Sequence, residues 1–100
     1  MNRAAVRRIL VAYDIPLDKR RATIAHILEG FGDRVQYSVF VVDAAPSRIV
    51  RLKAHLAAAI DPILDSILIC DLGSVATIGE STFSWLGRSR RLTASDSFIV

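Results

Sequence analysis

Apolar and polar residues alternate along the chain in a pattern that predicts regular elements joined by short turns. Residues 9–15 form an apolar and aromatic run that only Asp14 interrupts, which is typical of a strand buried on both faces and ending at a carboxylate. Pro16 follows and cannot donate a backbone hydrogen bond, so the strand stops there. We therefore expect Asp14 to lie at a strand-to-helix corner.

Two helices are predicted where apolar residues recur every three or four positions. The first covers residues 18–31, with Asp18 as a candidate N-cap and Gly30 and Gly32 as the stop. The second follows the proline at position 46, has Asp43 or Ser47 as its cap, and ends before the Asp-Pro pair at positions 61–62.

Strands are predicted between and after these helices. Residues 33–42 alternate with a period of two before turning wholly apolar, and residues 65–70 form another buried run. The order fits an α+β fold, the ferredoxin-like βαββαβ plait. That plait needs two antiparallel strands between its helices, yet residues 34–43 hold no Gly or Asn turn signal. Either a tight bend lies at residues 38–40 or one long bent strand serves both roles.

The last quarter of the chain is less regular. Phe83, Trp85 and Leu86 could anchor a short helix or an extended piece, and a basic run covers residues 88–91. The apolar end, residues 97–100, would be an unpaired edge if left free, so we expect it to add as a strand to a partner protomer's sheet, with a frayed terminus as the alternative. This divides the chain into a core of residues 1–73 and an extension of residues 74–100.

Composition limits the class of protein. The 100 residues suffice for one domain, and no apolar run approaches the ~20 residues of a membrane span, although 52% of the residues are hydrophobic and the mean hydropathy is +0.38. The basic start, followed by a short apolar run, does not fit a cleaved signal peptide. The single cysteine, Cys70, fits a reducing cytoplasm and is interpreted as a packed core thiol.

Positive charge gathers in four clusters. The formal net charge is +3, and eleven of the thirteen cations are arginines. The clusters lie at residues 3–8, 19–21, 48–53 and 88–91, and Arg34 stands apart from them. Arginine matches phosphate geometry, so nucleic acid is a candidate partner, while an ordinary solvated surface is the alternative. Lys19, Arg20 and Arg21 follow Asp14 within one helical turn, and an acid beside cations suggests phosphate chemistry. Alternatively, Asp14 binds backbone amides in a turn.

Four segments carry a resemblance to a known family. They are Val-Ala-Tyr-Asp-Ile at 11–15, Asp-Lys-Arg-Arg at 18–21, Arg-Val-Gln-Tyr-Ser-Val-Phe at 34–40, and Ile-Asp-Pro followed by Asp-Ser-Ile-Leu within 60–68. In order and spacing they resemble the Cas2 family, the small protein of the CRISPR spacer-acquisition pair. The resemblance covers about the first seventy residues.

The resemblance implies a ferredoxin-like fold, a two-fold homodimer, a cytoplasmic location and a role beside the CRISPR integrase subunit. Members are also described as Mg²⁺-dependent endonucleases on RNA or DNA, and their strand-end acid, a catalytic residue and metal ligand, maps to Asp14. The family's basic and polar residues map to Arg20, Arg21, Arg34 and Ser38, to which the basic cluster adds Lys19, and its aromatic residue maps to Phe40. An acid and a glycine common after that aromatic are replaced here by two valines.

Two mechanisms remain open at this stage, and we favour the second as the cellular role. In the first, the two copies of Asp14 in a dimer share one Mg²⁺ ion, which polarises a phosphodiester and activates a water. In the second, the dimer is a scaffold without catalysis, which holds the backbone of a DNA duplex with its arginine clusters and bridges two integrase subunits. The expected nucleic-acid partner is double-stranded DNA or single-stranded RNA, bound through its phosphates. A ferredoxin-like small-molecule regulator also fits the topology, but it would leave the arginines unexplained.

Overall fold

The computed structural model describes residues 5–89, in which strands and helices alternate. The elements follow along the chain as β1 (Arg7–Asp14), α1 (Asp18–Glu29), β2 (Asp33–Gln36), β3 (Val39–Ala44), α2 (Pro46–Ala59) and β4 (Ser66–Ser74). This is the βαββαβ succession that the sequence predicts.

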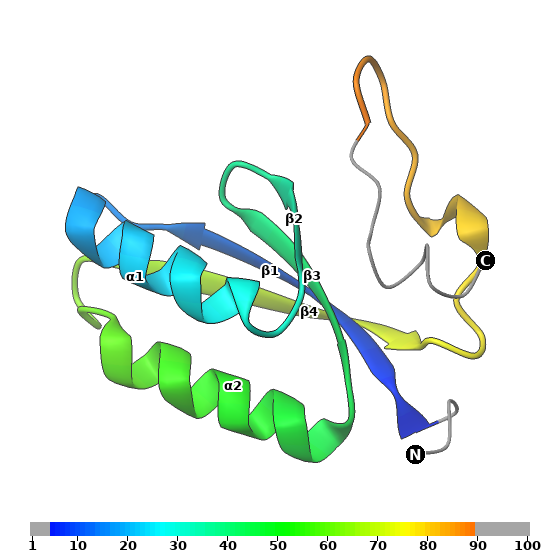
Figure 1. Cartoon of the computed structure of the whole chain (residues 1–100), viewed down its shortest axis with the longest axis horizontal. Helices are drawn as coiled ribbons and strands as arrows, with labels where there is room; N and C mark the ends of the chain where they lie inside the picture. Colours follow the sequence, from blue (N-terminus) through cyan, green and yellow to red (C-terminus); the bar gives the residue numbers. More distant parts are fainter. Residues whose placement is uncertain (1–4, 90–100) are drawn as a thin grey trace.

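The four strands form one antiparallel sheet in the order β2-β3-β1-β4. Both helices lie on the same face of this sheet, so the molecule has two layers (Figure 1). β1 pairs with β3 on one side and with β4 on the other, which makes the first strand of the chain a central strand. The ferredoxin-like plait is thereby confirmed.

Alternate side chains of β1 fill the space between the sheet and the helices. Ile9, Val11 and Tyr13 are at most 7% exposed and belong to one core cluster. The helices contribute Leu28 from α1 and Leu52 from α2 to the same cluster, and neither is exposed at all. Burying such aliphatic side chains contributes roughly 1.5–3 kcal/mol each, so this layer is the main source of stability.

The other face of β1 is not buried in the same way. Leu10 and Ala12 are half-buried and Asp14 is exposed, because no helix covers this side of the sheet. The prediction that the first strand is buried on both faces is therefore wrong. We call this side the free face of the sheet.

The chain reverses between β2 and β3 at Tyr37 and Ser38, so the tight bend is confirmed, beginning one residue earlier than predicted, and the single long bent strand is wrong. The pairing also shifts register between Arg34 and Gln36. No residue other than glycine has a positive φ among residues 5–89. The turn therefore does not use the left-handed conformation that favours Gly or Asn, which explains the missing sequence signal.

The first helix begins as predicted but without the predicted cap. Asp18 is the first helical residue, and Leu17 occupies the cap position with no side-chain hydrogen bond to the helix. The carboxylate of Asp18 instead forms an ion pair with Arg21. The helix ends at Glu29, two residues before the predicted end.

The second helix is likewise uncapped by a side chain. It begins at Pro46, preceded by Ala45 at the cap position, so neither Ser47 nor Asp43 serves as the cap. The carboxylate of Asp43 accepts two hydrogen bonds from Arg8 on the neighbouring strand β1, at 2.7 and 2.8 Å. The acid that the sequence suggested as a helix cap therefore joins two strands.

Just after β4 the chain still pairs with the segment before β1. The backbone N–H of Val75 donates to the carbonyl of Val6 at 2.9 Å, and the side chain of Val75 is buried. One turn of 3-10 helix covers Glu80–Thr82, and the stretch that follows to residue 89 is irregular. The division at residues 73 and 74 stays a prediction, and the predicted interface strand at residues 97–100 lies outside the described residues.

Candidate functional site

Asp14 ends β1 at the rim of the free face. Its side chain is exposed, and within residues 5–89 its carboxylate forms no hydrogen bond or ion pair. The alternative prediction, in which Asp14 binds backbone amides of the turn, is therefore wrong. A carboxylate at the end of a rigid central strand, without a protein partner, is free to bind a cation or a substrate group.

Two serines lie at the same end of the sheet as Asp14. Ser66 is the residue that faces Asp14 across the β1–β4 ladder. The carbonyl of Ser38 accepts the backbone N–H of Tyr13 at 3.0 Å, which places the β2–β3 turn beside the end of β1. Ser38 was predicted as a site residue, but Ser66 was not. The only sequence signal for Ser66 is its place at the start of the predicted last strand.

Arg21 fixes the corner that follows Asp14. Its Nη1 donates to the carbonyl of Ile15 at 2.8 Å, and its Nη2 pairs with Asp18. The hydrogen bond to Asp18 raises the pKa of Arg21 above its usual value, so the guanidinium stays charged. Arg21 therefore lies near the strand-end acid, as predicted, with part of its donor set used to hold the turn.

Arg20 has a different environment. Its guanidinium binds both carboxylate oxygens of Asp65, with Nη2 at 2.8 Å from Oδ1. The side chain of Asp65 is 0% exposed and also accepts the backbone N–H of Asp61 at 2.8 Å. The Arg20 hydrogen bond is the main cause that lowers the pKa of Asp65. This pair ties the start of α1 to the turn before β4, and the predicted nucleic-acid role of Arg20 stays a prediction.

We expect Arg20→Leu to lower the melting temperature by roughly 10 °C at pH 7, because it leaves the buried Asp65 carboxylate without a counter-ion. Asp65 has a lowered pKa in the folded state, so its contribution to stability is complete above the ordinary value of 3.8 and is lost as the pH falls further. The melting temperature of Arg20→Leu should therefore lie well below that of wild type at pH 7, and the difference should be smaller at pH 3. Arg51→Leu, at an exposed position of α2, is the control, and an equal loss in both variants would contradict the role of the ion pair.

The remaining predicted cations lie apart from each other. Lys19 is exposed and has no ion-pair partner within the described ranges of the chain. Arg34 is half-buried on β2, with its guanidinium carbon 5.2 Å from the centroid of the Phe40 ring. Its Nε is buried and donates to no acceptor within residues 5–89. Of the predicted set, Lys19 and Arg34 thus keep cationic groups that no described acid neutralises.

A strip of apolar side chains runs along the free face beside Asp14. We call it the free-face patch, and its members are half-buried or exposed: Leu10, Ala12, Val39, Leu68 and Cys70. The register aligns Leu10 with Cys70 and Ala12 with Leu68. Cys70 therefore lies on this face and not in the core, so the interpretation as a packed core thiol is wrong. Leu68 is 57% exposed and lies beside other apolar side chains, so the strip is a contiguous apolar surface open to solvent.

The described part of one chain does not form a metal cage. No group of three or more His, Cys, Asp or Glu side chains lies close enough to hold an ion among residues 5–89. Mg²⁺, however, commonly keeps several waters and binds through one or two carboxylates together with substrate phosphates. The unpaired carboxylate of Asp14 fits this mode of binding. Within the same residues, no helix has the length and apolar character needed to cross a bilayer.

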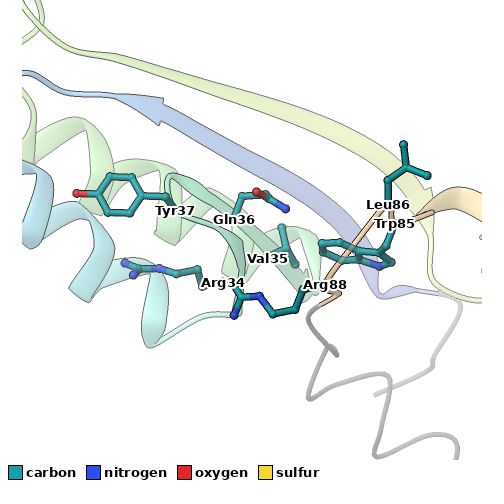
Figure 2. Close-up of a pocket in the computed structure, with 7 residues that line it drawn as sticks. All are labelled: Arg34, Val35, Gln36, Tyr37, Trp85, Leu86 and Arg88. Atoms are coloured by element: carbon teal, nitrogen blue, oxygen red, sulfur yellow. The ribbon is translucent and has the colours of Figure 1, made fainter.

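A hollow lies at the β2 edge of the sheet, which is the edge opposite β4, and it was not predicted from the sequence. Its lining comes from β2 and the β2–β3 turn, namely Arg34, Val35, Gln36 and Tyr37, and from the stretch after β4, namely Trp85, Leu86 and Arg88 (Figure 2). No sequence pattern links these segments, because almost fifty residues separate Tyr37 from Trp85.

Comparison with known proteins identifies similar sequences and structures. The sequence model of CRISPR associated protein Cas2 matches residues 7–77. A CRISPR-associated endoribonuclease Cas2 of Rhodospirillum rubrum is 48% identical over 71 residues, which cover 66% of this chain and 75% of that protein.

Two solved structures are also similar to the chain. Streptococcus pyogenes Cas2 superposes with a TM-score of 0.70 at 32% identity, covering 80% of this chain and 99% of that one. A chain of a partial Cas6-RT-Cas1–Cas2 complex superposes with a TM-score of 0.59 at 26% identity, covering 74% of this chain and 89% of that one. The residues that match the family model, 7–77, include all four strands, both helices and the Asp14 corner.

Proposed function

Because the chain belongs to the Cas2 family of CRISPR-associated proteins, we propose that it is the homodimeric, nucleic-acid-binding subunit of a spacer-acquisition complex in the cytoplasm. The similar chain of the Cas6-RT-Cas1–Cas2 complex supports a CRISPR integrase subunit as its partner. The observation that carries the proposal is the free-face patch, which ends at the unpaired acid Asp14.

The patch gives a physical reason for a two-fold dimer. Apolar side chains on an uncovered sheet face are stabilised when a second sheet packs on them, and a two-fold axis lets the same patch serve both protomers. Leu68, at 57% exposure, would lose most of its contact with water in such a dimer. Packing of this kind would also bring the two copies of Asp14, each at the rim of its patch, towards one axis.

Nucleic-acid binding would use the cations that have no acidic partner. Lys19 at the start of α1 and Arg34 on β2 are the best placed of the predicted residues, with Arg21 and Ser38 beside the Asp14 corner. Contacts between such side chains and phosphates are independent of base sequence and weaken with salt. Both double-stranded DNA and single-stranded RNA present the phosphates that these groups would bind. A dimer doubles the number of contacts along one duplex.

A second candidate function, metal-dependent phosphodiester cleavage, is favoured by the exposed and unpaired carboxylate of Asp14. Asp14 from each protomer would hold the Mg²⁺ ion, which supplies Lewis-acid polarisation of a phosphate and a more acidic water when bound. Arg21 would keep the corner rigid through its bond to Ile15, so that Asp14 points outward reproducibly. The uncommitted N–H groups of Arg21 would stabilise negative charge on a phosphate nearby.

The test of the proposed function is Leu68→Glu, which places a charge inside the proposed interface. We expect light scattering to give twice the chain mass of 11.0 kDa for wild type and the single mass for the variant. The variant should bind a DNA duplex more weakly and with a shallower salt dependence, because one protomer contacts fewer phosphates. It should also fail to co-elute with the CRISPR integrase subunit.

Leu64→Glu is the matched control, since Leu64 is 61% exposed in the turn before β4 and lies outside the free-face patch. This variant should remain dimeric and bind the duplex like wild type. The proposal is wrong if wild type is monomeric at micromolar concentration, or if both leucine variants behave alike.

A further inference from the structure

We propose that the hollow between β2 and the stretch after β4 is a binding site for one unpaired nucleotide, in which Trp85 stacks on the base and Arg88 and Arg34 bind the phosphates. This inference rests on the proposed nucleic-acid-binding function and adds a single-strand subsite distinct from the Asp14 corner. We call it the Trp85 pocket, with the seven lining residues given above.

The size and the shape of the pocket suit such a ligand. Its volume is about 430 Å³, within the range of roughly 300–1,000 Å³ that small-molecule sites occupy. The indole of Trp85 extends from the C-terminal stretch towards Val35 of β2, which is only 6% exposed (Figure 2). A planar base could therefore lie against the indole beside Val35. Leu86 points away from the pocket and is wholly exposed.

The charge of the pocket favours an anion. Among its seven lining residues there are two arginines and no carboxylate. Neither Arg34 nor Arg88 forms an ion pair within residues 5–89. The side chain of Arg88 extends towards β2, close to where the Arg34 side chain leaves the strand, whereas the Arg34 guanidinium lies farther along, towards Tyr37 (Figure 2). Phosphate oxygens on a nucleotide would supply the acceptors that both guanidinium groups lack.

Arg34 gives independent evidence that the protein itself leaves the site incomplete. Its Nε is shielded from water and has no acceptor in the described part of the chain. Leaving a buried donor unsatisfied is unfavourable, whereas the ring of Phe40, 5.2 Å from the guanidinium carbon, only partly compensates a cation. The Nη groups of the same guanidinium are not shielded, and a phosphate bound by them would offset part of that penalty. The pocket is thus prepared for a ligand with acceptor oxygens.

The remaining polar groups distinguish a nucleotide from a simple anion. Gln36 offers an amide that can both donate to and accept from the edge of a base, and Tyr37, which is 71% exposed, offers a second aromatic ring at the opposite end. Aromatic side chains beside cations are the usual composition of single-strand binding sites. Bases inside a duplex are stacked on each other and cannot reach an indole, so the ligand must be unpaired.

The test uses Trp85 as its own reporter, because it is the chain's single tryptophan. We expect an oligothymidylate of about eight nucleotides to quench the fluorescence of wild-type protein, whereas a blunt DNA duplex binds without comparable quenching. By anisotropy of a labelled oligothymidylate, Trp85→Leu should weaken binding by about five- to a hundredfold. Arg88→Gln should weaken it and reduce the slope of log affinity against log salt by about 0.7.

Control variants and competing ligands decide the outcome. Arg51→Gln removes an exposed arginine of α2 and should leave oligothymidylate binding unchanged, and all variants should bind the blunt duplex like wild type. Equal oligothymidylate affinity in wild type, Trp85→Leu and Arg88→Gln would overturn the pocket and leave the proposed function standing. Failure of wild type to bind either nucleic acid would overturn both. Equal quenching by a hexa-aspartate peptide would assign the pocket to an acidic peptide, and quenching that depends only on protein concentration would assign it to a second copy of the chain. Either result would overturn the proposal.

Discussion

Gly32→Ala should destabilise the protein by about 3 kcal/mol and lower its melting temperature by roughly 15 °C. A Cβ atom at this position would lie 2.2 Å from the carbonyl oxygen of Val41 and 2.8 Å from Cγ2 of Val42. Both are far below van der Waals contact, and the first is backbone in a central part of the sheet. The chain can accept the extra atom only if β2 or β3 shifts.

Gly30→Ala provides a matched control two residues earlier. There a Cβ would meet only the carbonyl oxygen of Ile27 at 3.4 Å, and the backbone has an ordinary helical φ of −76°. We expect this variant to melt within a few degrees of wild type, since a compatible Gly-to-Ala change alters stability by less than about 1 kcal/mol. Circular dichroism melts of both variants test the prediction, which is wrong if the two melting temperatures agree.

These two glycines show what the sequence could predict and what it could not. Both were interpreted as the end of the first helix, and Gly30 does close it, as the residue after Glu29. The reason for Gly32 is a close approach between the connection into β2 and the backbone of β3, a contact between segments that become neighbours only in the sheet. Helical and strand periodicity is local, so it predicts elements and their order. It carries no information on which backbones touch.

The same limit applies to the candidate site. Asp14 could be predicted as a site residue, because a single acid at the end of an apolar run can be recognised from the sequence alone. The different roles of Arg20 and Arg21 could not be predicted from the sequence, because the pairing of Arg20 with Asp65 depends on how the turn before β4 packs against α1. The sequence could not predict that Trp85 and Arg34 line one pocket, since this depends on the path of the chain after β4.

The second large effect is expected at the strand-end acid. Asp14→Asn should reduce Mg²⁺-dependent cleavage of RNA or DNA by about a thousandfold, because metal-ion catalysis contributes several kcal/mol and an amide is a poor ligand for Mg²⁺. The side chain is exposed and unpaired in the described chain, so the fold should be unaffected and the melting temperature should stay within about 2 °C of wild type. Cleavage assays with and without chelator measure the first effect, and thermal melts measure the second.

A binding measurement separates a true metal site from a contaminating nuclease. If packing of the free-face patches brings two Asp14 carboxylates together, their repulsion opposes dimerisation and Mg²⁺ relieves it. Wild-type dimers should therefore tighten when Mg²⁺ is added, whereas Asp14→Asn dimers should be tighter without the ion and insensitive to it. Glu29→Gln makes the same change of charge at an exposed position on α1 and should respond to Mg²⁺ like wild type. Asp14 does not bind the ion if cleavage survives in Asp14→Asn and if Mg²⁺ changes the dimer affinity of Asp14→Asn as much as that of wild type. The two measurements belong together, because only a metal site shared between protomers makes metal affinity and dimer affinity depend on the same residue.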